Sequence, residues 1–280
     1  MLYYTWFYKT IKDMNDKGFQ PYDISGRVAV IIGGARDLGF DMAEALAEAG
    51  CDLAITSRSH ESAEVAAGKL RSGYGVEVMS GGLDIRNHQK VVDFAEKIRE
   101  WKGNVDILVN NAGGNVGSPA TLFERDPEHI RQLIDTNLTG VLFCCQAFGK
   151  IMAERGTGSI INIASIAGLV GRDRRMYSNS DMGGQPIDYA AAKAGVIGMT
   201  MDLAGFLTPM GVRVNCISPG GFERGQPEAF IRDYSDATPM GRMGRDGIDL
   251  KGTVLYLAAP ASDYVTGQNI VVDGGFSIWK

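Results

Sequence analysis

The chain has 280 residues, of which 45% are hydrophobic and 22% charged, and its formal net charge is −5. This length suits one large α/β domain or two small ones, and the hydrophobic content argues against a disordered chain. The acidic balance and the lack of a basic stretch argue against nucleic-acid binding. The four cysteines form no C-x-x-C pair and the three histidines lie far apart, so we expect no metal site and a reducing, cytoplasmic environment.

The first ten residues, MLYYTWFYKT, are rich in aromatic side chains, but Lys9 and Lys12 interrupt the segment early. No small-residue cleavage site follows, so we expect no signal peptide. No run of about 18 apolar residues occurs, so we also expect no membrane span. An N-terminal arm over residues 1–21 that packs on the body or on a neighbouring subunit is the simpler interpretation. An anchor on a membrane surface is the alternative.

From Arg27 onward, short β-branched apolar runs alternate with longer amphipathic segments. Strands are expected at 28–32, 52–56, 76–80, 105–110, 159–164, 212–217 and 269–272. Helices are expected at 38–49, 62–71 and 88–101. This alternation predicts βαβ units and a parallel sheet, and runs that are apolar on both faces predict helices on each side of it. We therefore expect an α/β doubly wound parallel sheet in a single domain over residues 22–280.

A glycine-rich turn, IIGGARDLGF, follows the first expected strand. Gly33, Gly34 and Gly39 lie between a strand and a helix, where glycine lets the backbone approach a pyrophosphate. The helix N-terminus then offers free N–H groups and a partial positive charge. The position of the turn therefore indicates a dinucleotide site. Three further residues complete the turn and join the expected cofactor site: Arg36, Asp37 and Leu38.

The spacing of this turn resembles the G-x-x-x-G-x-G of the short-chain dehydrogenase/reductase family, with Asp37 in place of the middle glycine. A carboxylate here would repel a pyrophosphate, and we interpret Asp37 as a cap for the helix that starts near Leu38. The resemblance runs from about residue 26 to residue 275, where YVTGQNIVVDGG is typical of the last strand of the family. It implies a Rossmann fold, a nicotinamide dinucleotide and a homotetramer or homodimer.

The residues after the second strand bear on the choice of dinucleotide. An acidic side chain there would bind a ribose 2′-hydroxyl and favour NAD, but this chain has Ser57 and Arg58. Arg58 and Arg36 are instead suited to pair with a 2′-phosphate. We therefore expect NADP(H), with NAD(H) as the alternative if the two arginines are merely solvated.

Later motifs resemble the remaining cofactor contacts of the family. Asp84 and Ile85 follow the third strand, where the family contacts adenine. Three residues of an NNAG signature follow the fourth strand, where small side chains let a cofactor lie close to the backbone: Asn111, Ala112 and Gly113. Pro219 and Gly220 resemble the turn beside the nicotinamide, although Arg224 stands where the family often has threonine.

Tyr189 and Lys193 stand in YAAAK, four positions apart, and so share one face of a helix. The pKa of free tyrosine is about 10, and a nearby ammonium and an oxidised nicotinamide both favour the phenolate. Tyr189 would accept the alcohol proton during oxidation and donate it during reduction, while hydride moves directly between substrate and nicotinamide. The resemblance adds Ser165, which orients the reacting oxygen, and Asn137, which joins a proton relay with the lysine. These four residues complete a catalytic tetrad.

Tyr177 is an alternative to Tyr189, because the family usually has a shorter gap after the serine. Four residues beyond Tyr177 stands Asp181, whose carboxylate would raise the pKa of that phenol. We therefore favour Tyr189 and interpret residues 172–186 as an insertion near the active site. This segment either lines a substrate pocket or orders a lid, or it is a plain surface loop.

Together these features predict an enzyme that transfers a hydride between NADP(H) and a secondary alcohol or ketone. The arginines of residues 172–186 and the loop GGFERGQP resemble those of sugar-directed members, which implies a hydroxylated or sugar-like substrate, with an anionic one as a further option. One alternative is a 3-oxoacyl thioester reductase, which would need a basic surface for a carrier protein. Another is a non-catalytic dinucleotide-binding sensor or scaffold, which only Asp37 favours.

Overall fold

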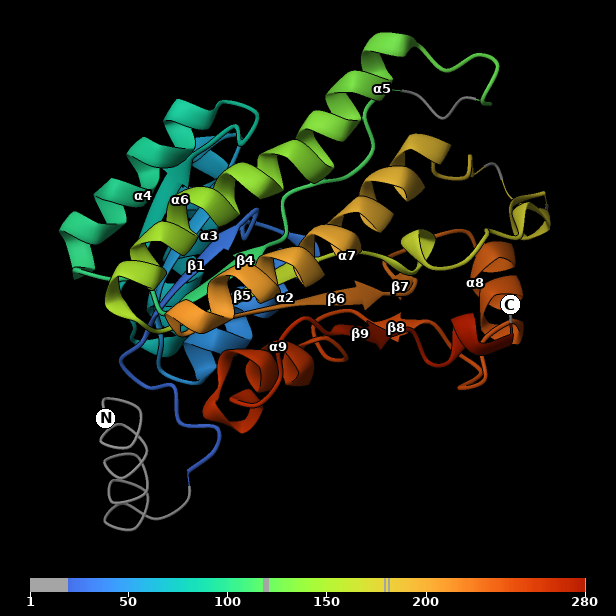
Figure 1. Ribbon diagram of the computed structural model, residues 1–280. Helices are drawn as coiled ribbons and strands as arrows, with labels where there is room; N and C mark the ends of the chain where they lie inside the picture. Colours follow the sequence, from blue (N-terminus) through green and yellow to red (C-terminus); the bar gives the residue numbers. More distant parts are fainter. Residues whose placement is uncertain (1–19, 118–120, 179, 181, 280) are drawn as a thin grey trace.

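A computed structural model describes residues 20–117, 121–178, 180 and 182–279 of the chain (Figure 1). Its centre is a sheet of seven parallel strands: β1 (Val28–Ile32), β2 (Asp52–Ser57), β3 (Val78–Gly82), β4 (Ile107–Asn110), β5 (Gly158–Ile163), β6 (Val212–Pro219) and β9 (Asn269–Val272). Their order is β3-β2-β1-β4-β5-β6-β9, so the chain winds outward in one direction from β1 and in the other from β4. The structure confirms the predicted doubly wound α/β fold.

The strands lie close to where the sequence places them, with ends that differ by at most two residues. β1 and β9 have the predicted bounds, whereas β3 starts two residues later than expected and includes Gly81 and Gly82. These glycines are typical of a turn, yet Gly81 pairs with Thr56 in the parallel ladder. A Cβ at Gly81 would overlap the ring of Phe94, so the close packing of a helix over this strand requires glycine.

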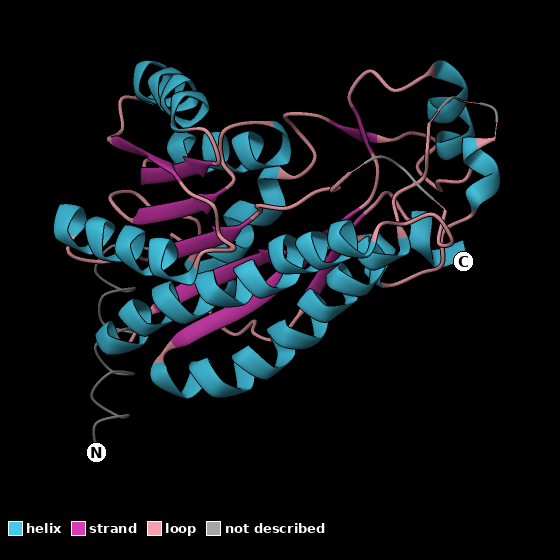
Figure 2. Cartoon of the chain, turned by 90° about the horizontal axis from the view of Figure 1, so that it is seen from above, coloured by secondary structure: helices cyan, strands magenta, loops and turns pink. Residues whose placement is uncertain are grey.

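Eight helices of the described chain surround the sheet: α2 (Asp37–Glu48), α3 (His60–Tyr74), α4 (His88–Lys102), α5 (Pro127–Ile134), α6 (Gly140–Arg155), α7 (Ile187–Leu207), α8 (Glu228–Asp236) and α9 (Lys251–Ala258). Seen from above, helices flank both faces of the sheet (Figure 2). Buried side chains of α2, α3 and α9 pack with Ile31 and Val109 on one face. Those of α4, α6 and α7 pack with Val30 and Leu108 on the other face. Alternate residues of each strand thus enter two separate cores.

A π-helical turn joins α5 to α6. It covers Asp135–Thr139, and the three elements follow one another without a break from Pro127 to Arg155. Asn137 lies inside this turn and is fully buried. A π-turn inserted in a longer helix frequently marks a functional site, because it redirects one side chain.

The sequence analysis did not anticipate the elements beyond the carboxyl end of β6. These are α8 and a two-stranded sheet of β7 (Phe222–Glu223) and β8 (Gly244–Arg245). Figure 1 shows them gathered at one end of the main sheet, beside the C-terminus. They add a wall above the strand ends, where the site lies.

Residues 187–210, which comprise α7 and the turn after it, form a segment long and apolar enough to cross a membrane by length and composition. Ala192, Val196 and Leu207 are nevertheless buried, and Leu207 packs with the residues of one of the two sheet cores. We therefore interpret α7 as a core helix of the Rossmann fold. The predicted N-terminal arm, apart from its last two residues, lies outside the described residues and stays a prediction.

Candidate active site

A cleft of about 660 Å³ opens at the carboxyl ends of the central strands, where the direction of winding reverses. This is the usual position of a ligand in such sheets, and the volume suits a small molecule. All but two of the site residues predicted from the sequence line it: Gly33, Arg36, Asp37, Leu38, Ser57, Arg58, Asp84, Ile85, Asn111, Ala112, Gly113, Ser165, Tyr189, Lys193, Pro219 and Gly220. The exceptions, Gly39 and Asn137, are buried against residues of its wall.

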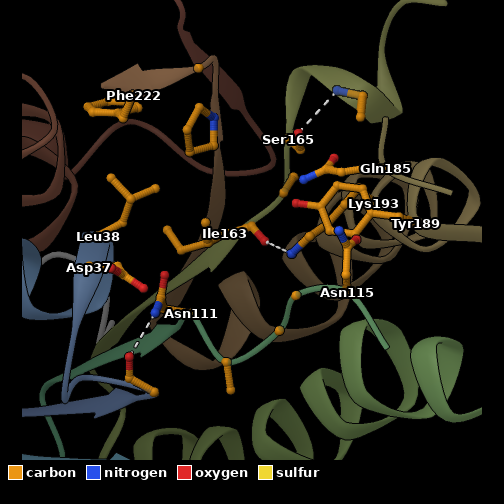
Figure 3. Close-up of a pocket in the computed structure, with 18 of the residues that line it drawn as sticks. Asp37, Leu38, Asn111, Asn115, Ile163, Ser165, Gln185, Tyr189, Lys193 and Phe222 are labelled. Atoms are coloured by element: carbon orange, nitrogen blue, oxygen red, sulfur yellow. Dashed lines mark hydrogen bonds between the residues drawn. The ribbon is translucent and has the colours of Figure 1, made fainter. Parts of the chain in front are cut away.

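Two glycines of the first turn are required by packing. Gly33 has a φ of +80°, and a Cβ there would lie 2.8 Å from the Cα of Ala112. A Cβ at Gly39 would overlap the carbonyl oxygen of Gly33 and the side-chain amide of Asn111. Asn111 donates a hydrogen bond from Nδ2 to that carbonyl oxygen at 2.8 Å. The turn after β1 and the loop after β4 are therefore locked together (Figure 3).

Asp37 does not cap α2 as expected. The N-cap position belongs to Arg36, whose backbone is extended, and no side chain caps the helix there. Asp37 is the first helical residue and, among the described residues, the one non-glycine with a positive φ, +54°. Its carboxylate forms an exposed ion pair with Arg36 at 3.4 Å instead. A positive φ normally favours glycine, which accounts for the family spacing that this chain departs from.

The end of the cleft where the sequence places the adenosine is rich in arginine. Arg86 binds Asp84 through Nη2 at 2.6 Å and through its backbone N–H at 3.1 Å. These hydrogen bonds from Arg86 lower the pKa of Asp84, and the charge of Arg58 adds to the effect. The Asp84 carboxylate is therefore held by Arg86 rather than left free. Arg58 itself has no ion pair with any described residue.

Asn137 holds the loop after β4. Its Nδ2 donates to the carbonyl oxygens of Gly114, at 2.9 Å, and Leu133, at 3.0 Å, while its Oδ1 accepts from the Gly114 N–H at 2.9 Å. Both N–H groups of the side-chain amide are thus used by the backbone. A Cβ at Gly113 would lie 2.6 Å from Asn137 Oδ1, so the backbone of the loop packs directly against the Asn137 side chain. The proton relay assigned to Asn137 by resemblance stays a prediction.

Tyr189 and Lys193 occupy the first two turns of α7. The Lys193 ammonium donates to the carbonyl oxygen of Ile163 at 2.7 Å and lies 5.6 Å from the centre of the Tyr189 ring. Figure 3 shows the lysine, the tyrosine and Ser165 converging on one side of the cleft. Burial lowers the pKa of Lys193 to about 8. No described carboxylate forms an ion pair with this lysine.

The pKa of Tyr189 differs from the sequence-based expectation. Burial raises it, and hydrogen bonds with the side chains of Ser165 and Gln185 and the charge of Arg172 act in the opposite direction. Arg172 is thus a positive charge that favours the phenolate, while the Lys193 ammonium is directed to the Ile163 carbonyl. The expected effect of Lys193 on this pKa stays a prediction.

Residues 172–186 form part of the cleft wall. The buried side chain of Met176 anchors this segment, and the ring of Tyr177 packs 5.2 Å from that of Phe230 on α8. Five of the side chains described in this segment line the cleft: Arg172, Met176, Tyr177, Met182 and Gln185. The pocket-lining interpretation is therefore supported over a plain surface loop. Tyr177 packs on Phe230, whereas Tyr189 is the phenol that lies beside Lys193.

Sequence reasoning missed an aromatic wall of the cleft, made by Phe230, Tyr234 and Phe276. The Phe230 ring lies 5.9 Å from that of Tyr234, which stacks on Phe276 at 4.4 Å. The hydroxyl of Tyr234 accepts a hydrogen bond from the Gly221 N–H at 2.6 Å, which fixes the turn after β6. Phe230 and Tyr234 are four positions apart in the sequence, so an amphipathic helix over this segment was the available signal.

Arg224, in place of the family threonine, forms ion pairs with acidic residues. Its Nε donates to Asp246 Oδ1 at 2.6 Å, and its Nη2 lies 3.8 Å from Asp41 on α2. Asp41 also accepts from the Gly247 N–H at 2.9 Å. This network fastens the loop after β6 to the helix that follows the glycine turn, so the charge of Arg224 is balanced.

Comparison with known proteins agrees with this geometry. A family model described as enoyl-(acyl carrier protein) reductase matches residues 33–277. A short-chain dehydrogenase from Leptospira borgpetersenii, solved with bound NAD⁺, superposes with a TM-score of 0.80 at 30% identity, over 91% of this chain and 94% of the other. The chain belongs to the short-chain dehydrogenase/reductase family. It is an oxidoreductase that uses a nicotinamide dinucleotide.

The relatives of this chain within the short-chain dehydrogenase/reductase family are named for different substrates. A 3-oxoacyl-(acyl-carrier-protein) reductase, FabG, from Chlamydia muridarum is 32% identical over 90% of this chain and 97% of its own. A galactitol 2-dehydrogenase from Rhizobium johnstonii is 33% identical over 93% and 98%. The structure of a gluconate 5-dehydrogenase from Burkholderia cenocepacia in complex with NADP and tartrate has a TM-score of 0.83 at 32% identity, covering 92% and 98%. The solved structures thus include both NAD and NADP complexes.

Proposed function

We propose that this short-chain dehydrogenase/reductase interconverts a secondary alcohol and a ketone on a polyhydroxylated substrate, with Tyr189 as the acid–base residue. The observation that carries the proposal is the position of the Tyr189 phenol. It lies beside the side chains of Ser165 and Gln185 (Figure 3), in a cleft whose other end is the glycine turn. A phenol positioned in this way can exchange a proton with a substrate oxygen while Ser165 orients that oxygen.

The described residues fit a nicotinamide dinucleotide, which supplies or accepts the hydride when bound. The backbone at Gly33 and at Gly113 packs so closely against neighbouring residues that a Cβ at either position would overlap one of them. The absence of side chains at these two positions leaves a narrow cradle along the strand ends. The NNAG loop after β4 and the N-terminus of α2 would hold the dinucleotide there. We favour NADP(H), because Arg58 has no ion pair among the described residues and is suited to a 2′-phosphate.

Proton transfer in this scheme involves the Tyr189 hydroxyl. During oxidation it takes the proton of the substrate alcohol, and during reduction it returns a proton to the carbonyl oxygen. Burial raises its pKa, so positive charge nearby is needed to make the phenolate accessible. Arg172 supplies such charge, and Lys193 would supply more if its ammonium turned from Ile163 toward the tyrosine.

The substrate end of the cleft supports a polyhydroxylated molecule. Amide side chains there can both donate and accept hydrogen bonds, as sugar hydroxyls do. These are Asn115, Gln185 and Gln226. The aromatic side chains of Tyr177, Phe230 and Tyr234 line the same cleft. Relatives named galactitol 2-dehydrogenase and gluconate 5-dehydrogenase point in the same direction.

Tyr189→Phe, with Tyr177→Phe as the matched control, tests the proposal. Oxidation of a panel of polyols and sugar acids is followed through NADPH absorbance. Tyr189→Phe should lower kcat by about 10²–10⁴-fold while NADPH still binds, because only the proton exchange is lost. Tyr177→Phe should retain most of kcat. The opposite pattern would transfer the acid–base role to Tyr177.

Reduction of a 3-oxoacyl thioester is the second candidate, favoured by the FabG relatives. Acetoacetyl-CoA in the same assay distinguishes the two, since a polyol enzyme should turn it over at least tenfold less efficiently than its best polyol. NADPH binding without turnover of any compound would favour the scaffold alternative that Asp37 suggested.

We also propose that the protein is a cytoplasmic homo-oligomer. Only 33% of the most apolar stretch of residues 187–210 is buried inside the chain, and Met201 and Phe206 on α7 are exposed. An exposed apolar surface of this kind is typical of a subunit contact. All four cysteines are free and buried, as in proteins kept in a reducing environment. Light scattering after gel filtration should give the mass of a dimer or tetramer.

A further inference from the structure

Arg172 is held in a fixed orientation at the substrate end of the cleft. Its Nη1 donates to the carbonyl oxygen of Gln185 at 2.6 Å, and its Nη2 donates to Gln185 Oε1 at 3.1 Å. A guanidinium has five N–H groups, so three remain for another acceptor. A side chain oriented in advance loses little entropy when it binds a ligand.

The charge of Arg172 is not balanced by any described carboxylate. Three other arginines of the cleft have acidic partners: Arg36 pairs with Asp37, Arg86 with Asp84 and Arg224 with Asp246. Among the described cleft arginines, this leaves Arg58, at the adenosine end, and Arg172. The described carboxylates that line the cleft, Asp37 and Asp84, also lie at the cofactor end. Among the described residues, the substrate end therefore carries a net positive charge.

Arg172 also lies close to the reacting centre. Gln185, which accepts both of its hydrogen bonds, is also one of the side chains that lower the pKa of the Tyr189 hydroxyl. Figure 3 shows Gln185 beside Tyr189 and Ser165. Burial raises the pKa of both Tyr189 and Tyr177, and the positive charge of Arg172 opposes that rise in each case. A single side chain thus separates the guanidinium from the phenol, so an anion on Arg172 would belong to the same small molecule as the reacting alcohol.

We infer that Arg172 binds the carboxylate of the substrate, and that the substrate is a polyhydroxylated acid rather than a neutral polyol. This inference rests on the proposed function and names its substrate class. A carboxylate can accept two of the free N–H groups in a charge-assisted pair, which is stronger than a hydrogen bond to a neutral hydroxyl. A phosphate ester presents a similar anion and is distinguished by the experiment.

The experiment compares Arg172→Gln with Arg175→Gln. Arg175 belongs to the same segment, but its side chain is 90% exposed, pairs with Asp173 and does not line the cleft. Each variant is assayed with a six-carbon aldonate, the alditol of the same length and a sugar phosphate. Arg172→Gln should reduce kcat/KM for the aldonate by about ten- to hundredfold more than for the alditol, mainly through KM. Arg175→Gln should leave this ratio unchanged.

Two results would overturn the inference. Equal losses for the aldonate and the alditol, with the pH profile of oxidation moved to higher pH, would mean that Arg172 acts only by lowering the pKa of Tyr189. If Arg172→Gln reduces kcat/KM for the sugar phosphate more than for the aldonate, the site is one for a phosphate. Arg172→Lys should recover part of the aldonate activity, because it restores the charge without the bidentate geometry.

Binding without turnover separates this inference from the proposed function. Calorimetry with tartrate, a small hydroxylated dicarboxylate, is performed on the enzyme saturated with NADPH. The wild type should bind tartrate at least tenfold more tightly than Arg172→Gln does. If tartrate binding depends on Arg172 but no alcohol is oxidised, the proposed function fails and the anion site stands. Equal tartrate affinity in both proteins would reject the anion site whatever the activity.

Discussion

Arg125 and Asp188 form an ion pair inside the protein, one residue before Tyr189. Arg125 Nη2 lies 2.8 Å from Asp188 Oδ2, and the two side chains are 3% and 7% exposed. Arg125 Nη1 also donates to the carbonyl oxygen of Val116 at 2.6 Å. One guanidinium therefore connects the loop after β4 to the first turn of α7. The ion pair fixes the part of the helix that presents the tyrosine to the cleft.

Arg125→Met should lower the free energy of unfolding by about 3–5 kcal/mol, because it leaves the Asp188 carboxylate buried without a partner. Urea denaturation at pH 7 and constant protein concentration measures the change. Arg131→Gln is the control, since the ion pair of Arg131 with Glu128 is 71% and 60% exposed and should contribute less than about 1 kcal/mol. Arg125→Met combined with Asp188→Leu should recover much of the loss. A single variant no less stable than the control would show that the pair is not structural.

Lys193→Met should stabilise the protein at pH 7 while it abolishes turnover. Burial lowers the pKa of Lys193 to about 8. Its charged form therefore costs the fold about 3 kcal/mol. This cost is complete below pH 8. It disappears as the pH rises toward the pKa that the lysine has in the unfolded chain. The lost hydrogen bond to Ile163 offsets about 1 kcal/mol of the gain.

Urea denaturation of Lys193→Met and wild type at pH 7 and pH 10 measures this gain, which should shrink as the pH rises. Lys150→Met is the control, because the Lys150 side chain is 78% exposed. A gain that is the same at both pH values would have to come from packing alone, and the pKa argument would fail.

The sheet was predictable because its strands carry local information. VAVII in β1 is β-branched and buried on both faces, so its place in a covered parallel sheet follows from the residues alone. The choice of Tyr189 over Tyr177 likewise rested on a local feature, the lysine four residues later. The structure brings that lysine beside the tyrosine on α7.

The substrate end was not predictable in the same way, because it depends on contacts between distant segments. Tyr177 packs on Phe230, and Tyr234 stacks on Phe276, although no local pattern pairs them. The assignment of Asp37 as a helix cap failed for a related reason. Its positive φ follows from the path of the whole turn, and propensity alone favours an aspartate as the cap.

Gly39→Ala and Gly68→Ala should have opposite effects, although both glycines lie inside helices. A Cβ at Gly39 would overlap the Gly33 carbonyl oxygen, whereas one at Gly68 on α3 meets no atom within 4 Å. Gly39→Ala should therefore cost about 1–3 kcal/mol and weaken NADPH binding. Gly68→Ala should add up to about 1 kcal/mol through helix propensity. Thermal unfolding measures the change in stability of each variant, and fluorescence titration measures its affinity for NADPH. A change in stability of the same sign in both variants would contradict the packing argument.

Arg58→Gln should weaken binding of NADPH by about tenfold or more and leave binding of NADH nearly unchanged, because only NADPH carries the 2′-phosphate. Fluorescence titration with each dinucleotide gives the ratio of affinities. Arg99→Gln is a suitable control, since Arg99 pairs with Glu96 on the surface of α4. If the wild type binds NADH more tightly than NADPH, the preference for NADP(H) is wrong, whatever the variant does.

Replacement of Asp37 tests whether its carboxylate weakens the phosphate site. Asp37 begins α2 with a φ of +54° and pairs with the exposed Arg36. Asp37→Gly removes the charge and suits the backbone, whereas Asp37→Asn removes the charge and keeps a side chain of the same size. Both should bind NADPH about two- to fivefold more tightly at low salt, because a negative charge leaves the N-terminus that would receive the pyrophosphate.

The two Asp37 variants also separate charge from shape. A gain seen only with Asp37→Gly would mean that the side chain hinders close approach of the backbone. A gain shared by both variants and lost at 1 M salt would mean that charge dominates, since salt screens exposed charges. Release of Arg36 from its pair should make the gain larger for NADPH than for NADH, because Arg36 then becomes available to the 2′-phosphate. Unchanged affinity in both variants would place the bound phosphates away from Asp37.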